Sequence, residues 1–371
     1  MTTTPIMTLT AAFDAQHTAF RRALERKDRV VVLSSPSVPV EIVRAAGLNP
    51  IVVRGGASPT PTADGRLEAG VFPPGLRWLA EAALSGFLAN AARIVFPRTS
   101  DPDYKCFLYL REFARLGVAP ALPPVSLFDL LQSEGPHVRA YNVARTGALL
   151  KELTHAEGRS LSLDAVRHEI ERANFARAAA RKLIALRKGA PRVTGTEVLP
   201  LLGAFWALDP EVYATFATAA AKEIAQRPTI SGPRILLAGA PVDSPALHST
   251  IESRGAVVVA EIGAWGTGVA GEDVVCADDP IATLADKYYA DTIGPRTPIT
   301  RMRRLVEEHL DNVDAVVISL PPEDTAFGWD YPWLRTLLEK KGIPHTCVSS
   351  PDHERFDTLM NALARAEVRR G

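Results

Sequence analysis

Short apolar runs alternate along this chain with stretches of helical periodicity. In residues 233–268, branched apolar residues at 234–238 precede a polar loop, a helical pattern and a second apolar run at 257–260. Leu247 and Ile251 are four residues apart, so they share one face of the helix between the two runs. This strand–helix–strand order predicts a βαβ unit, whose loops at the carboxyl ends of the strands are the usual ligand positions of such folds.

A second unit of the same kind lies near the start of the chain. It has an apolar run at 30–33, a helical pattern at 40–46 and another apolar run at 50–53. Further strands are expected directly before Arg98, near Val125, at Asp314–Ser319 and at Pro344–Val348. Strands that alternate with helices predict parallel sheets covered on both faces. We therefore expect an α/β fold with a parallel sheet in each half of the chain.

A long helical segment separates the two halves. Residues 138–187 and 197–226 are amphipathic, and proline and glycine then mark a linker. The expected organisation is an N-terminal α/β domain at 1–137, a helical segment at 138–228 and a C-terminal α/β domain at 229–371.

Three local expectations concern the flanks of these domains. Residues 9–27 have the periodicity of one helix, and residues 57–75 are rich in Pro, Thr, Gly and Ala, which is typical of a long loop. Residues 321–330 also read as a loop, after which a helix from Pro332 to Lys341 is expected, because proline is tolerated in a first helical turn.

Composition and motif searches mainly exclude classes of partner, location and cofactor site. The 371 residues carry 42 basic and 42 acidic side chains, so the net charge of zero does not favour nucleic acid or an anionic membrane as partner. The sequence lacks an apolar membrane-spanning run and a secretory signal pattern, so a cytoplasmic location with reduced thiols is expected for its 3 cysteines. The dinucleotide fingerprint GxGxxG does not follow any expected strand, and GxxxxGK[ST], HExxH and GxSxG do not occur.

A collinear series of stretches resembles a known family. The stretches are VPVEIVRAAGLNPIVV, RIVFPRTSD, PRILLAGAPVDSPALHSTIESRGAVVVAE, DDPIATLADKYY, VDAVVIS and DYPWLRTLLEKKGIPHTCV. In this order they are similar to the 2-hydroxyacyl-CoA dehydratase and benzoyl-CoA reductase family, over residues 29–125 and 230–371. The resemblance implies two flavodoxin-like or Rossmann-like domains that flank a cleft.

The resemblance also implies a chemistry, a cofactor and partners. In the family, the cleft holds a four-iron, four-sulfur cluster on three cysteines, with one position open for an acyl-CoA thioester carbonyl. An ATP-driven activator delivers one electron, and the ketyl radical that results permits dehydration or ring reduction. In the family, two related subunits work together as a heterodimer. An acyl-CoA or small acid ligand, and a related cysteine-bearing subunit or a homo-oligomer, are therefore implied for this chain.

The chain departs from the family at all three cysteine positions. The loop before Leu76 has FPPG at 72–75, the position before Asp101 is Ser100, and residues 321–324 are PPED. Thiolate is the normal ligand of such clusters, a serine hydroxyl is far less acidic, and proline offers no ligand atom. We expect the family cluster to be absent and assign no metal ligands. Cys106 could approach the cleft, but a structural role in its helix is favoured.

Candidate site residues come from the strand-end loops. The candidate catalytic residues are Ser35, Ser37, Ser100 and Glu323, and the candidate substrate-binding residues are Arg98, Asp101, Trp265, Gly266, Asp324 and Trp329. A serine hydroxyl can hydrogen-bond a thioester carbonyl, an arginine can hold a phosphate or carboxylate, and paired carboxylates serve acid–base work. Indole rings can stack on adenine or an aromatic acyl group, and glycine lets a ligand approach the backbone.

Each of these residue types also has a structural interpretation. The serines can cap a helix, Arg98 can pair with Asp101 or Asp103, the acidic pair can lie in a solvated loop, and the tryptophans can pack. Three functions stay open. The chain is a cluster-less subunit or an acyl-CoA-binding relative, an active dehydratase or reductase with atypical ligands from Ser100, Cys106 or Glu323, or a non-enzymatic binding or regulatory protein.

Overall fold

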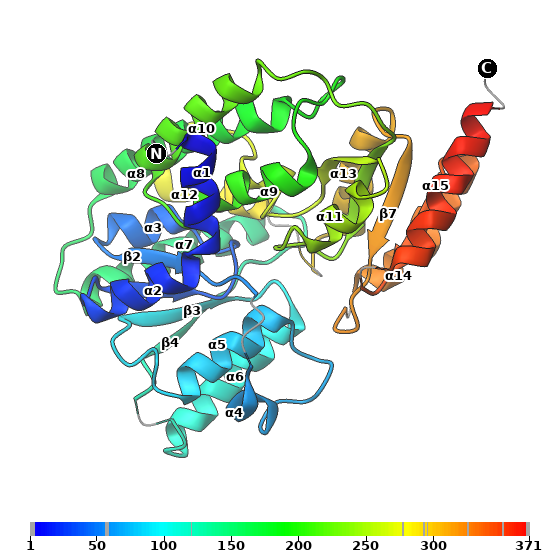
Figure 1. The fold of residues 1–371 in the computed structure, drawn as a ribbon. Helices are drawn as coiled ribbons and strands as arrows, with labels where there is room; N and C mark the ends of the chain where they lie inside the picture. Colours follow the sequence, from blue (N-terminus) through cyan, green and yellow to red (C-terminus); the bar gives the residue numbers. More distant parts are fainter. Residues whose placement is uncertain are drawn as a thin grey trace. The chain divides into compact units, whose positions relative to one another are not determined.

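The computed structural model divides into two compact units (Figure 1). The structure describes residues 4–55, 59–119, 121–276, 278–291, 294, 296–324, 326–350 and 352–368. Unit 1 comprises Met1–Asp14, Ala176–Gly271 and Thr297–Gly371, and unit 2 comprises Ala15–Phe175 and Glu272–Arg296. The domain boundaries expected at residues 137 and 228 stay predictions.

Unit 2 is built on a parallel sheet with the strand order β2-β1-β3-β4. Its strands are β1 (Val30–Leu33), β2 (Asn49–Val52), β3 (Arg93–Pro97) and β4 (Val125–Phe128). Its helices are α2 (Gln16–Glu25), α3 (Val40–Ala45), α4 (Pro61–Asp64), α5 (Pro74–Leu84), α6 (Asp101–Arg115), α7 (Pro136–Ala156) and α12 (Pro280–Asp291), and α8 (Leu163–Ala185) leads into unit 1. Every residue of β1 is buried, as expected for a central parallel strand covered on both faces.

Unit 1 repeats this topology with the strand order β6-β5-β7-β8. Its strands are β5 (Arg234–Gly239), β6 (Val257–Glu261), β7 (Ala315–Ser319) and β8 (His345–Val348). Its helices are α1 (Pro5–Asp14), α9 (Gly195–Gly203), α10 (Pro210–Ile224), α11 (Ala246–Glu252), α13 (Ile299–Leu310), α14 (Phe327–Lys341) and α15 (His353–Val368), with 3₁₀ turns at Ala204–Trp206 and Thr267–Val269.

The two parallel sheets confirm the expected α/β fold. In each sheet the strand order reverses between the first and third strands of that unit, β1 and β3 in unit 2 and β5 and β7 in unit 1. Such a switch point leaves a crevice at the carboxyl ends of two neighbouring strands, which is where ligands bind in open α/β sheets. Among the helices of the described residues, none is long and apolar enough to cross a membrane.

Local sequence signals misplaced some helix ends. The single helix expected at 9–27 is two helices, α1 and α2, and a short helix, α4, interrupts the loop expected at 57–75. Helix α14 begins at Phe327 rather than Pro332, because Asp324 accepts hydrogen bonds from the backbone N–H groups of Phe327 (3.0 Å) and Gly328 (2.7 Å). This carboxylate cap starts the helix more than one turn before the proline.

A buried ion pair joins the chain after α8 to the end of β6 in unit 1. Arg187 donates two hydrogen bonds to the Glu261 carboxylate, from Nη1 to Oε2 (2.6 Å) and from Nη2 to Oε1 (3.1 Å). The exposed fractions of these residues are 1% and 3%. Burial alone would raise the pKa of Glu261, but the Arg187 guanidinium and the other nearby positive groups hold this pKa below its ordinary value. The pair therefore stays charged inside the unit.

Removing one member of this pair should be costly. We expect Arg187→Met to lower the free energy of unfolding by about 3–5 kcal/mol, because Glu261 is then left buried without its guanidinium. Adding Glu261→Gln to this variant should recover part of the loss, and Lys188→Met, at an exposed neighbouring position, should change little. Urea unfolding measures all three variants. Equal stabilities for Arg187→Met and Lys188→Met would contradict this account.

Candidate functional site

The switch point of unit 2 brings together the loops that follow β1 and β3. These strands are parallel neighbours, with Leu33 opposite Val95 in the register. The backbone N–H of Ser34 continues the ladder by donating to the Val95 carbonyl (3.2 Å), and Arg98 N–H donates to the Phe128 carbonyl of β4 (3.0 Å). Side chains just beyond these strands therefore gather at one edge of the sheet.

A buried carboxyl, Asp103, connects the two loops. Ser34 Oγ donates a hydrogen bond to Asp103 Oδ1 (2.8 Å), and Ser100 Oγ donates to Asp103 Oδ2. Ser100 is also the N-cap of α6, since its hydroxyl accepts from the Asp103 backbone N–H (3.1 Å). The exposed fraction of Asp103 is 7%. We call Ser34, Ser100 and Asp103 the hydroxyl–carboxyl cluster.

The environment of Asp103 changes its acidity. Burial raises the pKa of Asp103 to about 6, although the hydrogen bonds from Ser100 and Ser34 act in the opposite direction. A carboxyl that titrates near neutral pH can hold or release a proton under physiological conditions. The sequence analysis named Ser100 as a catalytic candidate but considered Asp103 only as a possible ion-pair partner of Arg98.

The other two candidate serines organise the loop before α3. Ser35 Oγ donates to Ser37 Oγ (3.1 Å) and accepts from the Ser37 backbone N–H (3.2 Å). The first turn of α3 is held by Tyr288 of α12, whose hydroxyl accepts from the Val40 N–H (3.2 Å) and donates to the fully buried Glu41 carboxyl (2.8 Å). Tyr288 is therefore a positioning residue that the sequence analysis did not identify.

Arg98 lies at the same edge with a different partner from the two that were expected. Its Nη1 donates to Asp129 Oδ2 (3.3 Å), not to Asp101 or Asp103, and its guanidinium carbon lies 4.8 Å from the Tyr104 ring centroid. Arg98 Nε is buried and has no hydrogen-bond partner among the described residues. The guanidinium therefore keeps a donor for a further acceptor.

Asp101, expected to bind substrate, pairs with an arginine from a distant segment. Arg296 Nη2 donates to Asp101 Oδ1 (2.8 Å), and a Cβ built on Gly294 would lie 3.2 Å from the Thr99 carbonyl oxygen. The segment that returns to unit 2 after the chain has built most of unit 1 thus lies against the loop after β3. No local signal in residues 98–101 could have identified these partners.

Three candidate residues lie after β7 in unit 1: the acidic pair Glu323 and Asp324, and Trp329. Gly239 at the end of β5 has φ +90°, and a Cβ there would overlap the Ser319 carbonyl, so only glycine lets the ends of β5 and β7 come this close. Asp324 is occupied as the cap of α14, and Glu323 is half-buried with Oε2 lacking a hydrogen-bond partner among the described residues. The exposed fraction of Trp329 is 86%.

Packing accounts for Trp265 and Gly266. The Trp265 indole is 6% exposed and meets the Phe13 ring edge-on, with ring centroids 6.5 Å apart. A Cβ at Gly266 would overlap the buried Glu261 carboxylate, so glycine leaves room for the ion pair with Arg187. These two residues support the core of unit 1, and the expectation that they bind substrate stays untested.

The residues at the expected cluster positions do not fit an iron–sulfur cluster. Ser100 is committed to Asp103 and to the α6 cap, and FPPG and PPED offer no thiolate. Cys106 lies fully buried in the core of unit 2, where burial raises its pKa and keeps it a neutral thiol. Within the described residues, there is no group of three or more His, Cys, Asp or Glu side chains that could hold a metal ion.

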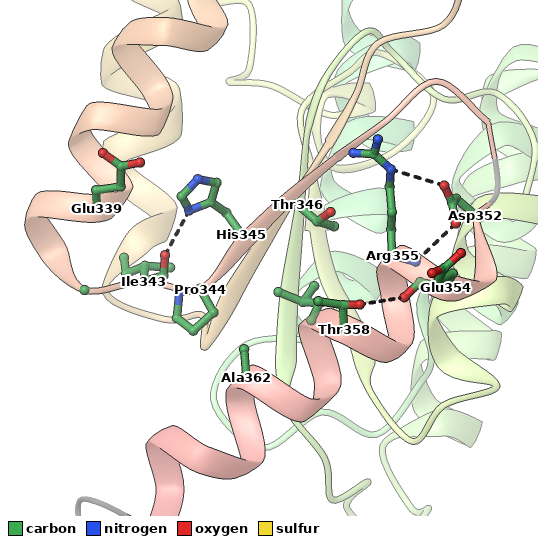
Figure 2. Close-up of a pocket in the computed structure, with 12 residues that line it drawn as sticks. Glu339, Ile343, Pro344, His345, Thr346, Asp352, Glu354, Arg355, Thr358 and Ala362 are labelled. Carbon is green, nitrogen blue, oxygen red and sulfur yellow. Dashed lines mark hydrogen bonds and ion pairs between the residues drawn. The ribbon is translucent and has the colours of Figure 1, made fainter.

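A groove of about 860 Å³ lies elsewhere, along the free edge of β8 (Figure 2). Arg355 of α15 crosses this edge: its Nη1 donates to the Cys347 carbonyl (2.8 Å), and its Nε lies 3.2 Å from Asp352 Oδ2. Because the arginine satisfies an edge carbonyl, it also protects the strand from pairing with another chain. This groove is not at a switch point, so we do not place the functional site in it.

Comparison with known proteins identifies the family. The family model described as 2-hydroxyglutaryl-CoA dehydratase, D-component, matches residues 37–361, from the loop after β1 into α15. No curated protein matches the chain. The family match confirms the resemblance seen in the sequence, and the strand-end loops of both units lie within it, apart from the first residues after β1. The chain belongs to the 2-hydroxyglutaryl-CoA dehydratase D-component family.

Proposed function

We propose that this chain is a member of the 2-hydroxyacyl-CoA dehydratase family that carries no iron–sulfur cluster. In this proposal it binds an acyl-CoA or a related small acid at the switch point of unit 2, and it works as the partner of a related chain that carries the cysteines. The family match supports the acyl-CoA ligand class. The loss of the cysteines supports a role in binding rather than in electron transfer.

One observation carries the proposal. At the position where the resemblance implies a cysteine ligand, Ser100 caps α6 and donates to the buried Asp103, which also accepts from Ser34. A hydroxyl used in both ways keeps its proton, which is hydrogen-bonded to a carboxyl, so it does not offer the deprotonated oxygen that would replace a thiolate. In this proposal, the edge of the sheet still binds a ligand, as in the family, but it does so with hydroxyl and carboxyl groups instead of a cluster.

These groups suit recognition of a thioester or a small acid. The Ser37 hydroxyl accepts from Ser35, so its own proton can be donated to a carbonyl oxygen, and the Nε–H of Arg98 can donate to a carboxylate or phosphate. Asp103, with its pKa near 6, can carry a proton next to a bound ligand. Binding, orientation and proton transfer are therefore the contributions that we propose for this chain.

The alternative with atypical cluster ligands is less well supported. It needs Cys106 as a thiolate, but this side chain is fully buried among apolar residues and burial raises its pKa. Ligation by Cys106 would also require α6 to expose its core-facing side, at the expense of contacts within the core of unit 2.

Anaerobic purification tests the cluster-less proposal. We expect the chain to be colourless and free of stoichiometric iron and sulfide, whereas a cysteine-bearing member of the family, purified in parallel, should show both. A thiolate-type visible spectrum with stoichiometric iron in this chain would contradict the proposal.

Binding of acetyl-CoA is a separate expectation. Saturating acetyl-CoA should raise the Tm, and Ser37→Ala should weaken this stabilisation, because the loop loses the hydroxyl whose proton is not donated within the Ser35–Ser37 pair. Ser160→Ala, at an exposed position in the break before α8, should behave as the wild type. An unchanged Tm with acetyl-CoA, in a chain that also fails to associate with the cysteine-bearing member, would overturn the proposal.

The pKa of Asp103 predicts a pH-dependent stability. Between the ordinary pKa of 3.8 and about 6, the folded state keeps a proton that the unfolded state loses, so stability falls as the pH rises through this window. The decrease in the free energy of unfolding that is due to Asp103 should reach about 3 kcal/mol above pH 6. Asp103→Asn has no carboxyl to titrate at this position and so lacks this decrease. The variant should therefore gain stability relative to the wild type as the pH rises from 4 to 7.

Urea unfolding at several pH values between 4 and 7 measures this difference. The matched control is Asp101→Asn, in the same helical turn but with an exposed side chain, and its profile should follow the wild type within about 1 kcal/mol. Parallel profiles for Asp103→Asn and the wild type would show that Asp103 titrates normally.

A further inference from the structure

A small cavity lies at the switch point of unit 1 and has no part in the function proposed above. The ends of β5 and β7 form its floor through Ala238, Gly239 and Ile318, and helices α13 and α14 line its other sides. It measures about 30 Å³, the share of one water molecule in the liquid, so a methyl-sized group fits inside.

Most of the lining is apolar. Met302 and Val306 come from the buried face of α13, and Phe327 and Leu334 come from the buried face of α14. A cavity with such walls favours a methyl group over water, because water would have few hydrogen-bond partners there. The apolar part of a ligand therefore belongs inside, and its polar part at the rim.

Arg303 supplies a donor at this rim. Its guanidinium carbon lies 4.6 Å from the Trp333 ring centroid, so the indole fixes the guanidinium plane. Arg303 Nε is buried and has no hydrogen-bond partner among the described residues. A buried donor without an acceptor is costly, so the geometry calls for a ligand oxygen at this position.

Asp330 supplies an acceptor at the same rim. Burial raises the pKa of Asp330, the charge of Arg303 lowers it, and the charge of Asp324 raises it again. The carboxylate is therefore partly desolvated and lies in the field of a second carboxylate. A donor from a ligand would stabilise its charged form.

The donor of Arg303 and the acceptor of Asp330 decide which ligand fits. A carboxylate has no donor for Asp330, and an amidinium has no acceptor for Arg303 Nε, so neither ion satisfies both sides. A neutral planar group with one acceptor and one donor satisfies both sides at once, and a primary amide is such a group.

We propose that this cavity binds a small aliphatic carboxamide, with the methyl group inside, the carbonyl oxygen accepting from Arg303 Nε and the amide N–H donating to Asp330. The proposal does not rest on the function proposed for unit 2, and its residues differ from those tested there. It assigns unit 1 a ligand site of its own.

Three isosteric probes test this donor–acceptor argument on the full chain. Acetamide, acetate and acetamidinium share one shape and carry charges of 0, −1 and +1. Ligand-detected saturation-transfer NMR titrations should give an acetamide Kd about tenfold or more below those of the two ions. As an independent readout, the pKa of Asp330, followed by carboxyl NMR, should fall when acetamide binds.

Two neighbouring arginines provide matched variants. Arg303→Met should weaken acetamide binding about tenfold or more, whereas Arg304→Met should leave it unchanged, because Arg304 is exposed and pairs with Glu308. Val306→Ile, which adds one methylene to the cavity wall, should also abolish binding in a folded protein. Tighter binding of either ion, no detectable binding of acetamide, or equal Kd values for the two arginine variants would each overturn the proposal.

Discussion

The burial of one carboxyl, Asp103, constrains the site of unit 2. Its two oxygens accept hydrogen bonds from Ser34, at the end of β1, and from Ser100, at the start of α6. Because β1 and β3 are parallel neighbours, the loops after them meet at one edge, and the carboxyl fixes their relative positions. The same bonds occupy the serine at an expected cysteine position, which supports our proposal that this chain keeps the architecture of the family without its cluster.

Much of the fold could be predicted because parallel strands in a covered sheet are continuous apolar runs. The run Val30–Leu33 was identified to the residue, and the bounds of its neighbour β2 to within one residue. The errors came from signals that a tertiary contact outweighs. Pro332 looked like a helix start, but the Asp324 carboxylate caps the helix at Phe327. Such a cap depends on where a side chain turns, which the local pattern does not encode.

The site was only partly predictable, for reasons of distance along the chain. Ser100 and Arg98 could be identified because they follow a strand directly. Asp103 could not, since its burial depends on Ser34, 69 residues earlier. Tyr288 and Arg296 belong to a segment that returns to unit 2 after most of unit 1 has been built, so the contacts they make are invisible to any local pattern.

A carboxyl NMR titration of Asp103, without and with saturating acetyl-CoA, tests most directly whether the hydroxyl–carboxyl cluster is the ligand site of this chain. The account predicts a pKa of about 6 for Asp103 in the free chain, because burial raises it, and a clear change of this pKa when acetyl-CoA is bound next to the cluster. A pKa close to the ordinary value of 3.8, unchanged by acetyl-CoA, would contradict the account.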